Sequence, residues 1–270
     1  MSYPRVSVIV PALNEERNLE HVLPKIPPTV HEVILVDGFS TDGTVARAKE
    51  LWPDIRVVHQ DGPGKGAALQ SGFRAATGEI IVMLDADGST DPGEIPAFVR
   101  TLIDGADFAK GSRFLRGGGT ADMPGYRKLG NFGFVGLVRL MYGGRYTDLC
   151  YGYNAFWRYV LPALALDASG FEVETMMNIR ALRAGLDVRE VPSFEAARVH
   201  GEGRLRTIPD GMRVLRTIFR ERRRRTARMD RSGVAQAQLG RLAVPVMGQH
   251  DDRIAIPVEV EASNEALVTR

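Results

Sequence analysis

The stretch IVMLDADGST, residues 81–90, decides the predicted fold, because a strongly apolar run ends there in two aspartates and a turn. An apolar run of this kind, bounded by a turn, predicts a strand that is buried on both faces of a sheet. Asp85 and Asp87 stand on alternate positions at the tip of that strand. Two carboxylates this close repel one another unless a cation or a proton neutralises them. We therefore predict that a divalent metal ion binds here.

The rest of the N-terminal half repeats this alternation of apolar strands and helical segments. Strands are predicted at residues 5–11, 32–37, 55–60 and 79–85, and helices at 15–26, 40–52, 64–77 and 92–105. Ser40 or Thr41 is the expected cap of the second helix. Buried strands joined by helices are typical of a parallel sheet covered on both faces. We predict an α/β fold with a mostly parallel central sheet.

Beyond residue 107 the pattern is less regular. Two more strands are predicted at 106–114 and 187–192, and three more helices at about 127–142, 172–185 and 208–225. Residues 115–128 form a glycine-rich, charged loop of the kind that often carries function. Residues 226–270 show no sustained period. We predict one domain over residues 1–225, followed by a poorly ordered tail.

Composition narrows the class of protein. With 270 residues, 44% of them hydrophobic, the chain is long enough to bury a full core. Its single cysteine, Cys150, excludes an intramolecular disulfide and fits a reducing compartment. We find no basic-then-apolar leader, and no run approaches the ~20 apolar residues of a membrane span. These features predict a cytoplasmic protein, either free or peripheral to a membrane.

Polar residues follow each of the four N-terminal strands. In an open α/β sheet the carboxyl ends of the strands share one edge, and ligands bind there. The residues at that edge are Pro11, Asn14, Glu15, Asp37, Lys65, Asp85 and Asp87. A lone aspartate after a strand usually only shapes a turn. Four strand ends that all carry polar groups favour a binding site instead.

The segment DADGSTD, residues 85–91, has three possible roles. As a calcium loop it fails, because Gly88 comes too early and Pro96 stands where an EF-hand has its bidentate glutamate. Aspartate and glycine also favour turns, so simple turn chemistry stays open. Hard oxygen ligands at this spacing suit Mg²⁺ or Mn²⁺ that bridges the phosphates of a substrate.

The glycine-rich segment at 61–72 raises the alternative of an NAD(P)-binding oxidoreductase. Gly62, Gly64 and Ala67 match a loose G-x-G-x-x-A, and the acidic Asp85 follows roughly 20 residues later. A dinucleotide-binding fingerprint opens its fold, however, whereas this segment follows the third strand. We keep this reading as a minor alternative.

Five segments together resemble glycosyltransferase family 2, whose members have the GT-A fold. In order they are VSVIVPALNEERNL, ILVDGFSTDGT, GKGAALQSGF, GEIIVMLDADGSTDP and KGSRF. Within that family the chain is similar to the dolichol-phosphate-mannose-synthase-like branch, whose members move a sugar from a nucleotide donor to a polyprenyl phosphate. The resemblance covers residues 4–222. It implies a metal-dependent, inverting transferase that uses a GDP- or UDP-linked sugar.

The resemblance also implies roles for single residues. The expected nucleotide-sugar site comprises Pro11, Leu13, Glu15, Asp37, Lys65, Asp85 and Ala86. Asp85 and Asp87 are the D-x-D element that would hold Mg²⁺ or Mn²⁺ with the diphosphate, and His200 is the expected third metal ligand. Leu13 stands where the family has an aromatic residue, and Gly38 replaces a second acid. The sugar and the base therefore stay open.

The groups expected to act in the reaction are Asp87, Glu174, Arg113 and Arg127. The two arginines match family arginines that face phosphates, and a guanidinium pairs well with phosphate oxygens. Met176 stands where the family often has an acid, so Glu174, with Glu172 behind it, is the remaining candidate for a general base. A hydroxyl acceptor needs such a base, whereas a phosphate acceptor is already anionic. We therefore expect a polyprenyl-phosphate acceptor. A hydroxyl acceptor with Glu174 as base, and a non-catalytic sugar-nucleotide-binding protein, remain alternatives.

The segment 198–225 is the part of the sequence that suggests contact with a membrane surface. Met212, Leu215 and Phe219 share one stripe of the predicted helix, with Val214 and Ile218 beside it and arginines around it. Such a helix fits an anionic membrane surface, or packs on the core with its arginines in water. One arginine run without interleaved aromatic residues is a weak sign of nucleic-acid binding. We predict peripheral contact with an anionic membrane surface and no nucleic-acid partner.

Overall fold

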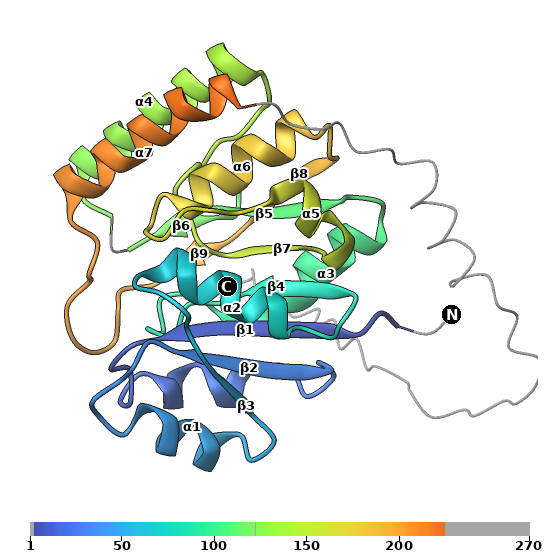
Figure 1. The fold of residues 1–270 in the computed structure, drawn as a ribbon, viewed down its shortest axis with the longest axis vertical. Helices are drawn as coiled ribbons and strands as arrows, with labels where there is room; N and C mark the ends of the chain where they lie inside the picture. The colour runs from blue at the N-terminus through green and yellow to red at the C-terminus, as the bar shows by residue number, and fades with distance from the viewer. Residues whose placement is uncertain (1–2, 122, 225–270) are drawn as a thin grey trace, which may run out of the picture.

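The computed structural model describes residues 3–121 and 123–224, so the predicted tail at 226–270 lies outside the described residues. Its strands are β1 (Val6–Ala12), β2 (Glu32–Asp37), β3 (Arg56–His59), β4 (Ile80–Met83), β5 (Phe108–Ser112), β6 (Gly119–Thr120), β7 (Asn154–Trp157), β8 (Val188–Pro192) and β9 (Phe194–Glu195). Seven of them form the central sheet in the order β3-β2-β1-β4-β7-β5-β8, and β6 pairs with β9 separately (Figure 1).

Helices cover both faces of the sheet. They are α1 (Thr44–Leu51), α2 (Lys65–Ala75), α3 (Ile95–Ile103), α4 (Gly125–Tyr142), α5 (Leu161–Leu164), α6 (Val173–Arg183) and α7 (Thr207–Arg223). The described residues also contain four short 3₁₀ turns: η1 (Leu19–His21), η2 (Leu23–Lys25), η3 (Pro92–Glu94) and η4 (Arg158–Val160). α4 and α7 lie side by side, outside α6, at one end of the molecule (Figure 1).

The alternation of side chains along the strands explains the two layers of helices. In β1, Val8 and Val10 pack in the core beneath α1 and α3, whereas Ile9 faces the opposite core with α2 and α6. Both sets are fully buried. Successive side chains of a strand point to opposite faces, so a strand that is buried along both sets of positions needs cover on both sides. This confirms the predicted α/β layering.

The sheet is mostly parallel, as predicted, with one exception. β1 runs parallel to both β2 and β4, and β5 runs parallel to β8. β7 is antiparallel to both of its neighbours, β4 and β5. The four residues of β7 show no alternation of apolar and polar side chains that distinguishes them from the rest of the segment 147–158. We did not predict a strand there.

Two local predictions were wrong. The helix expected at 15–26 is a pair of 3₁₀ turns, η1 and η2, because Pro24 has no amide to donate and interrupts a continuous helix. The helix expected from residue 40 begins only at Thr44. Its first amide is satisfied by Asp42, whose Oδ1 accepts from the amide of Thr44 at 3.0 Å, and not by Ser40 or Thr41.

Candidate functional site

The predicted polar residues do meet at one edge of the sheet. Asp37 is the last residue of β2 and pairs in register with Ala12 at the end of β1. β4 ends at Met83 and the chain continues through Leu84 to Asp85, where the amide of Leu84 still donates to the carbonyl of Ile9 in β1. Because these strands are parallel, their carboxyl ends open on the same side.

The aspartates of the D-x-D element face away from the core. Ala86 is buried in one apolar core of the sheet, whereas the side chains of Asp85 and Asp87 are about a quarter exposed. One oxygen of Asp87 accepts from the amide and the hydroxyl of Ser89, at 3.0 and 2.7 Å. These bonds fix one oxygen of the carboxylate, and the other oxygen accepts from the Arg198 guanidinium.

Lys65 joins two acids across this edge. Its ammonium lies 2.6 Å from Oδ1 of Asp85 and 2.9 Å from Oε1 of Glu174. Lys65 is the first residue of α2, and Glu174 lies in the first turn of α6. The glycine-rich segment that suggested NAD(P) binding thus delivers a lysine to the D-x-D element. A Cβ at Gly152 would lie 2.7 Å from the Lys65 ammonium, so a larger residue there would displace the side chains of the cluster.

Burial governs the charges of this cluster. Glu174 is 4% exposed, and burial raises the pKa of its carboxyl, an effect that the Lys65 ammonium opposes. Burial also disfavours the charged form of Lys65, but Asp85 and Glu174 more than offset it and raise the pKa of the ammonium. Lys65 is therefore a cation held between two carboxylates.

Arg198 makes a second bridge. Its guanidinium donates to Oε2 of Glu15 at 2.6 Å and to Oδ2 of Asp87 at 3.2 Å. The segment that carries it also reaches β1 through Arg204, which donates to the carbonyl of Leu13 at 2.9 Å. Residues 198–204 therefore close over the ends of β1 and β4.

The donor set fits a magnesium or manganese ion that shares its coordination with a ligand. Asp85 and Asp87 offer hard oxygen atoms, and Asp87 already attracts a cationic group, the Arg198 guanidinium. Within residues 3–121 and 123–224, no three His, Cys, Asp or Glu side chains gather closely enough to hold a metal ion by themselves. Diphosphate oxygens and water would have to supply the other positions.

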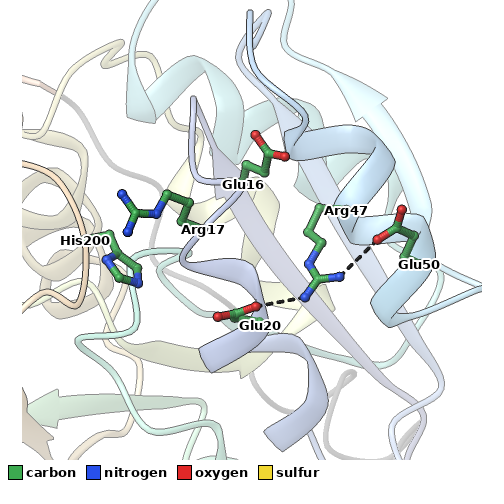
Figure 2. Close-up of a pocket in the computed structure, with 6 residues that line it drawn as sticks. All are labelled: Glu16, Arg17, Glu20, Arg47, Glu50 and His200. Atoms are coloured by element: carbon green, nitrogen blue, oxygen red, sulfur yellow. Dashed lines mark hydrogen bonds and ion pairs between the residues drawn. The ribbon is translucent and has the colours of Figure 1, made fainter.

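His200 is not brought to the two aspartates in this arrangement. Its ring lies 5.6 Å from the ring of His21, and its amide donates to the side chain of Asn18. It lines a recess of about 560 Å³ beside Arg17 and the ion-paired Arg47 (Figure 2). Its role as a third metal ligand stays a prediction.

The predicted phosphate-binding arginines have protein partners. Arg113 is buried, and its guanidinium donates to both oxygens of Asp148, at 2.6 and 2.9 Å, and to Glu195 at 3.0 Å. Arg127, in the first turn of α4, donates to Thr207 and to the carbonyl of Leu205, both at 3.3 Å. The structure does not bring either arginine to the D-x-D element, so their roles as phosphate ligands remain predictions.

The remaining predicted residues line the ends of β1 and β2. Pro11 and Leu13 are partly exposed, and Glu15 is buried against Arg198. Asp37 is 2% exposed and accepts from the amide of Phe39 at 3.1 Å. These positions are compatible with the nucleotide site expected from the sequence.

Three features of the site were not predicted from the sequence. Arg198 and Arg204 had no assigned contact, although the basic stretch RVHGEGRLR signals a cationic segment. The pairing of Lys65 with Glu174 has no local signal, because 109 residues of chain separate them in the sequence. Met176, the residue in place of a family acid, is fully buried in the core, while Glu172 lies just before α6 and does not contact Lys65 in this arrangement.

Comparison with known sequences gives a consistent set of relatives. A family model described as glycosyl transferase family 2 matches residues 7–164. A dolichol-phosphate mannosyltransferase from Pyrococcus furiosus is 32% identical over 75% of this chain, which spans only 59% of that protein. A polyprenol monophosphomannose synthase from Mycolicibacterium smegmatis is 34% identical over 70% of this chain and 76% of its own. An undecaprenyl-phosphate mannosyltransferase from Micrococcus luteus is 33% identical, with coverage of 74% and 87%.

Solved structures agree on the fold. Glucosyl-3-phosphoglycerate synthase from Mycobacterium tuberculosis, in complex with Mn²⁺, uridine-diphosphate and phosphoglyceric acid, superposes with a TM-score of 0.66 at 27% identity. The match covers 82% of this chain and 79% of that chain. A complex of the same synthase with Mg²⁺ and uridine-diphosphate gives a TM-score of 0.64 at 29% identity.

Proposed function

The chain belongs to glycosyltransferase family 2 and has the GT-A fold, and on that premise we propose that it transfers a sugar from a nucleoside-diphosphate donor to a polyprenyl phosphate. The reaction would invert the anomeric carbon in a single displacement and depend on Mg²⁺ or Mn²⁺. The observation that carries this proposal is the meeting of Asp85, Asp87 and Glu15 at one sheet edge, with Lys65 and Arg198 between them.

Asp85 and Asp87 would hold the metal ion together with the donor diphosphate. The metal, when bound, supplies positive charge where the leaving diphosphate develops negative charge. Arg198 is well placed to move from the two carboxylates onto a phosphate, because a guanidinium pairs with both kinds of oxygen in the same way. Lys65 would hold Asp85 in position.

The surroundings of Glu174 support a phosphate acceptor. A hydroxyl acceptor needs a group that removes its proton in the transition state. Glu174, the base expected from the sequence for that case, is buried and shares its carboxylate with the Lys65 ammonium. A phosphate monoester needs no such base. We therefore place Glu174 among the groups that position Asp85 through Lys65.

The outer faces of α4 and α7 support contact with a membrane. Ile208, Met212 and Phe219 on α7 are 78%, 45% and 52% exposed. Leu129 and Leu140 on the adjacent α4 are 73% and 84% exposed. Apolar side chains of this size rarely stay uncovered on two neighbouring helices unless they meet a partner.

The opposite face of α7 is fixed to the domain. Val214 and Ile218 are buried against α4 and α6, and the buried Glu221 accepts from Arg180 of α6 at 2.8 and 2.9 Å. Arginines flank the exposed stripe, so the surface combines apolar and basic groups as a peripheral membrane helix does. Within residues 3–121 and 123–224 no helix is long and apolar enough to cross a membrane. We propose peripheral contact with the cytoplasmic, anionic membrane face.

A second candidate is transfer to a hydroxyl of a small acceptor. It is favoured by one observation, the likeness to a synthase crystallised with uridine-diphosphate and phosphoglyceric acid. Three relatives at 32–34% identity are instead a dolichol-phosphate mannosyltransferase, a polyprenol monophosphomannose synthase and an undecaprenyl-phosphate mannosyltransferase, which is why we rank the lipid acceptor first.

A donor screen tests both candidates. The full chain is incubated with Mn²⁺, GDP- or UDP-linked sugars, and either a short-chain polyprenyl phosphate or 3-phosphoglycerate. We expect a lipid-linked product from one donor, and its loss with a chelator or in Asp87→Ala. Product on phosphoglycerate alone would support the second candidate. Donor binding without turnover under any condition would indicate a non-catalytic binding protein and refute the proposal.

A further inference from the structure

Phe39 has a backbone conformation that bulky residues avoid. It follows β2 by two residues, and its φ angle is +64°. In the described part of the chain the other non-glycine residues with positive φ are Asn14 and Ala165. Asparagine tolerates this left-handed region and phenylalanine does not, so Phe39 is an outlier that the surrounding structure must enforce.

Hydrogen bonds to two side chains enforce it. The carboxylate of Asp37 accepts from the amide of Phe39 at 3.1 Å and from the amide of Ser40 at 3.2 Å. The side chain of Asn14, from the loop after β1, accepts from the amide of Thr41 at 2.8 Å. The turn is therefore held from both neighbouring strands, and it presents the ring of Phe39 outward.

The ring stacks on an exposed histidine. The centroids of Phe39 and His59 lie 5.7 Å apart, with only 10° between the ring planes. Phe39 is 64% exposed and the His59 side chain 62%. A pair this exposed covers little of the core, so burial of apolar surface does not account for the strained turn.

The turn that carries Phe39 lies next to Leu13, the position where the family has an aromatic residue. A Cβ added to Gly38 would lie 3.2 Å from Cβ of Leu13, so the turn directly adjoins the position that is aromatic in the family. β2 is two strands from β4 in the sheet, or roughly 10 Å from the D-x-D element at about 4.8 Å per strand. An extended nucleoside diphosphate covers such a span.

We propose that Phe39, supported by His59, is the stacking surface for the nucleobase of the donor, in place of the missing aromatic at Leu13. The inference rests on the proposed function, because it assumes a nucleoside-diphosphate donor whose phosphates lie at Asp87. Base stacking on an aromatic ring accepts any base, since every base has a π-face. The buried carboxylate of Asp37 would hold the turn that presents this ring.

The substitution Phe39→Asn removes the ring and suits the left-handed backbone. It therefore separates the effect of the ring on binding from the effect of backbone strain on stability. Calorimetry with Mn²⁺ measures the affinities of the full chain for GDP, UDP and inorganic pyrophosphate, which has no base. We expect Phe39→Asn to weaken binding of the preferred nucleotide by about 5- to 100-fold. Pyrophosphate affinity should not change, and the melting temperature should be equal or higher because strain is relieved. Phe39→Tyr, which keeps the ring, should retain nucleotide affinity.

Each outcome has a clear meaning. Unchanged nucleotide affinity in Phe39→Asn would overturn the inference and leave the proposed function intact. Equal losses for nucleotide and pyrophosphate, or a lower melting temperature with unchanged affinity, would also overturn it, since Phe39 would then only shape the fold. A wild-type chain that binds pyrophosphate but neither nucleotide would overturn the inference together with the proposed donor.

Discussion

The ammonium of Lys65 lies 2.6 Å from Oδ1 of Asp85, which ties the start of α2 to the tip of β4. Glu174 completes the cluster from α6 at 2.9 Å. The lysine stands between the D-x-D element and the acid that a base mechanism would use. We therefore propose positioning, and not proton transfer, for Glu174, and mutant kinetics can test this proposal.

Glu174→Gln should lower kcat/KM by less than about tenfold and leave the shape of the pH–rate profile unchanged. The amide keeps an acceptor for Lys65 but removes a charge, so only the fixing of Asp85 is weakened. A general base would instead contribute about 10²- to 10⁴-fold, and its loss would remove the acidic limb of the profile. Such a result would restore Glu174 as the base. Glu79→Gln, at the amino end of β4 and paired with Arg5, is the control without effect.

Arg198→Gln should bind Mn²⁺ alone more tightly than the wild-type chain. The guanidinium lies 3.2 Å from Asp87 and competes with any cation there. A like charge at a partly exposed site opposes the ion by about 1 kcal/mol, or roughly fivefold in affinity. Titration of free Mn²⁺ by electron paramagnetic resonance measures the difference. Arg17→Gln, in the neighbouring recess, should leave the affinity unchanged. Equal or weaker binding in Arg198→Gln would show that the guanidinium does not occupy the cation position.

The double substitution Met212→Asp and Phe219→Asp should release the chain from anionic lipid vesicles. Both side chains are about half exposed on the outer stripe of α7. Burial of one large apolar side chain is worth about 2 kcal/mol, so partitioning should fall at least tenfold. Co-sedimentation at two salt concentrations measures apolar and electrostatic contributions separately. Ile103→Asp on α3 adds one charge at another exposed apolar site and is the control. Equal partitioning of the double variant and the control would contradict a membrane role for α7.

Asp148→Asn should lower the free energy of unfolding at pH 7 by about 3 kcal/mol, because it leaves the buried Arg113 without its main partner. Burial opposes ionisation of Asp148, but hydrogen bonds and charge from Arg113 hold the pKa of its carboxyl below the usual value. The pair therefore contributes stability above the unfolded pKa of ~4, and this is lost as pH falls through the folded pKa.

Denaturant unfolding between pH 3 and pH 7 measures this dependence. The difference in free energy of unfolding between the wild-type chain and Asp148→Asn should become smaller toward acid pH. The exposed pair Arg100–Asp104 supplies the control, since Asp104→Asn should change stability by at most about 0.5 kcal/mol. A difference in free energy of unfolding that stays constant with pH would show that the carboxylate is not the source of the stability.

Several elements were predictable because their signal is local. The buried strands β1, β2 and β4, and the helices α1 and α2 between β2 and β4, follow from apolar runs and periodicity. The D-x-D element was placed correctly at the end of β4, since parallel strands fix which residues face the ligand edge. β7 was not predicted, because its place between β4 and β5 depends on contacts with those strands and not on a pattern within its own residues. For α7 the sequence left membrane and core packing open, and the structure assigns Val214 and Ile218 to the core.

The sequence by itself determined the fold class, the family, and the edge of the sheet where Asp85 and Asp87 lie, since residues close together in the chain carry those patterns. Only the tertiary structure decided that Lys65 holds Glu174, that Arg198 reaches Glu15 across 183 residues, and that Phe39 turns its ring outward. The physical reason is that charge pairing and backbone strain depend on distance in space. Packing of remote segments sets that distance, and no local periodicity encodes it.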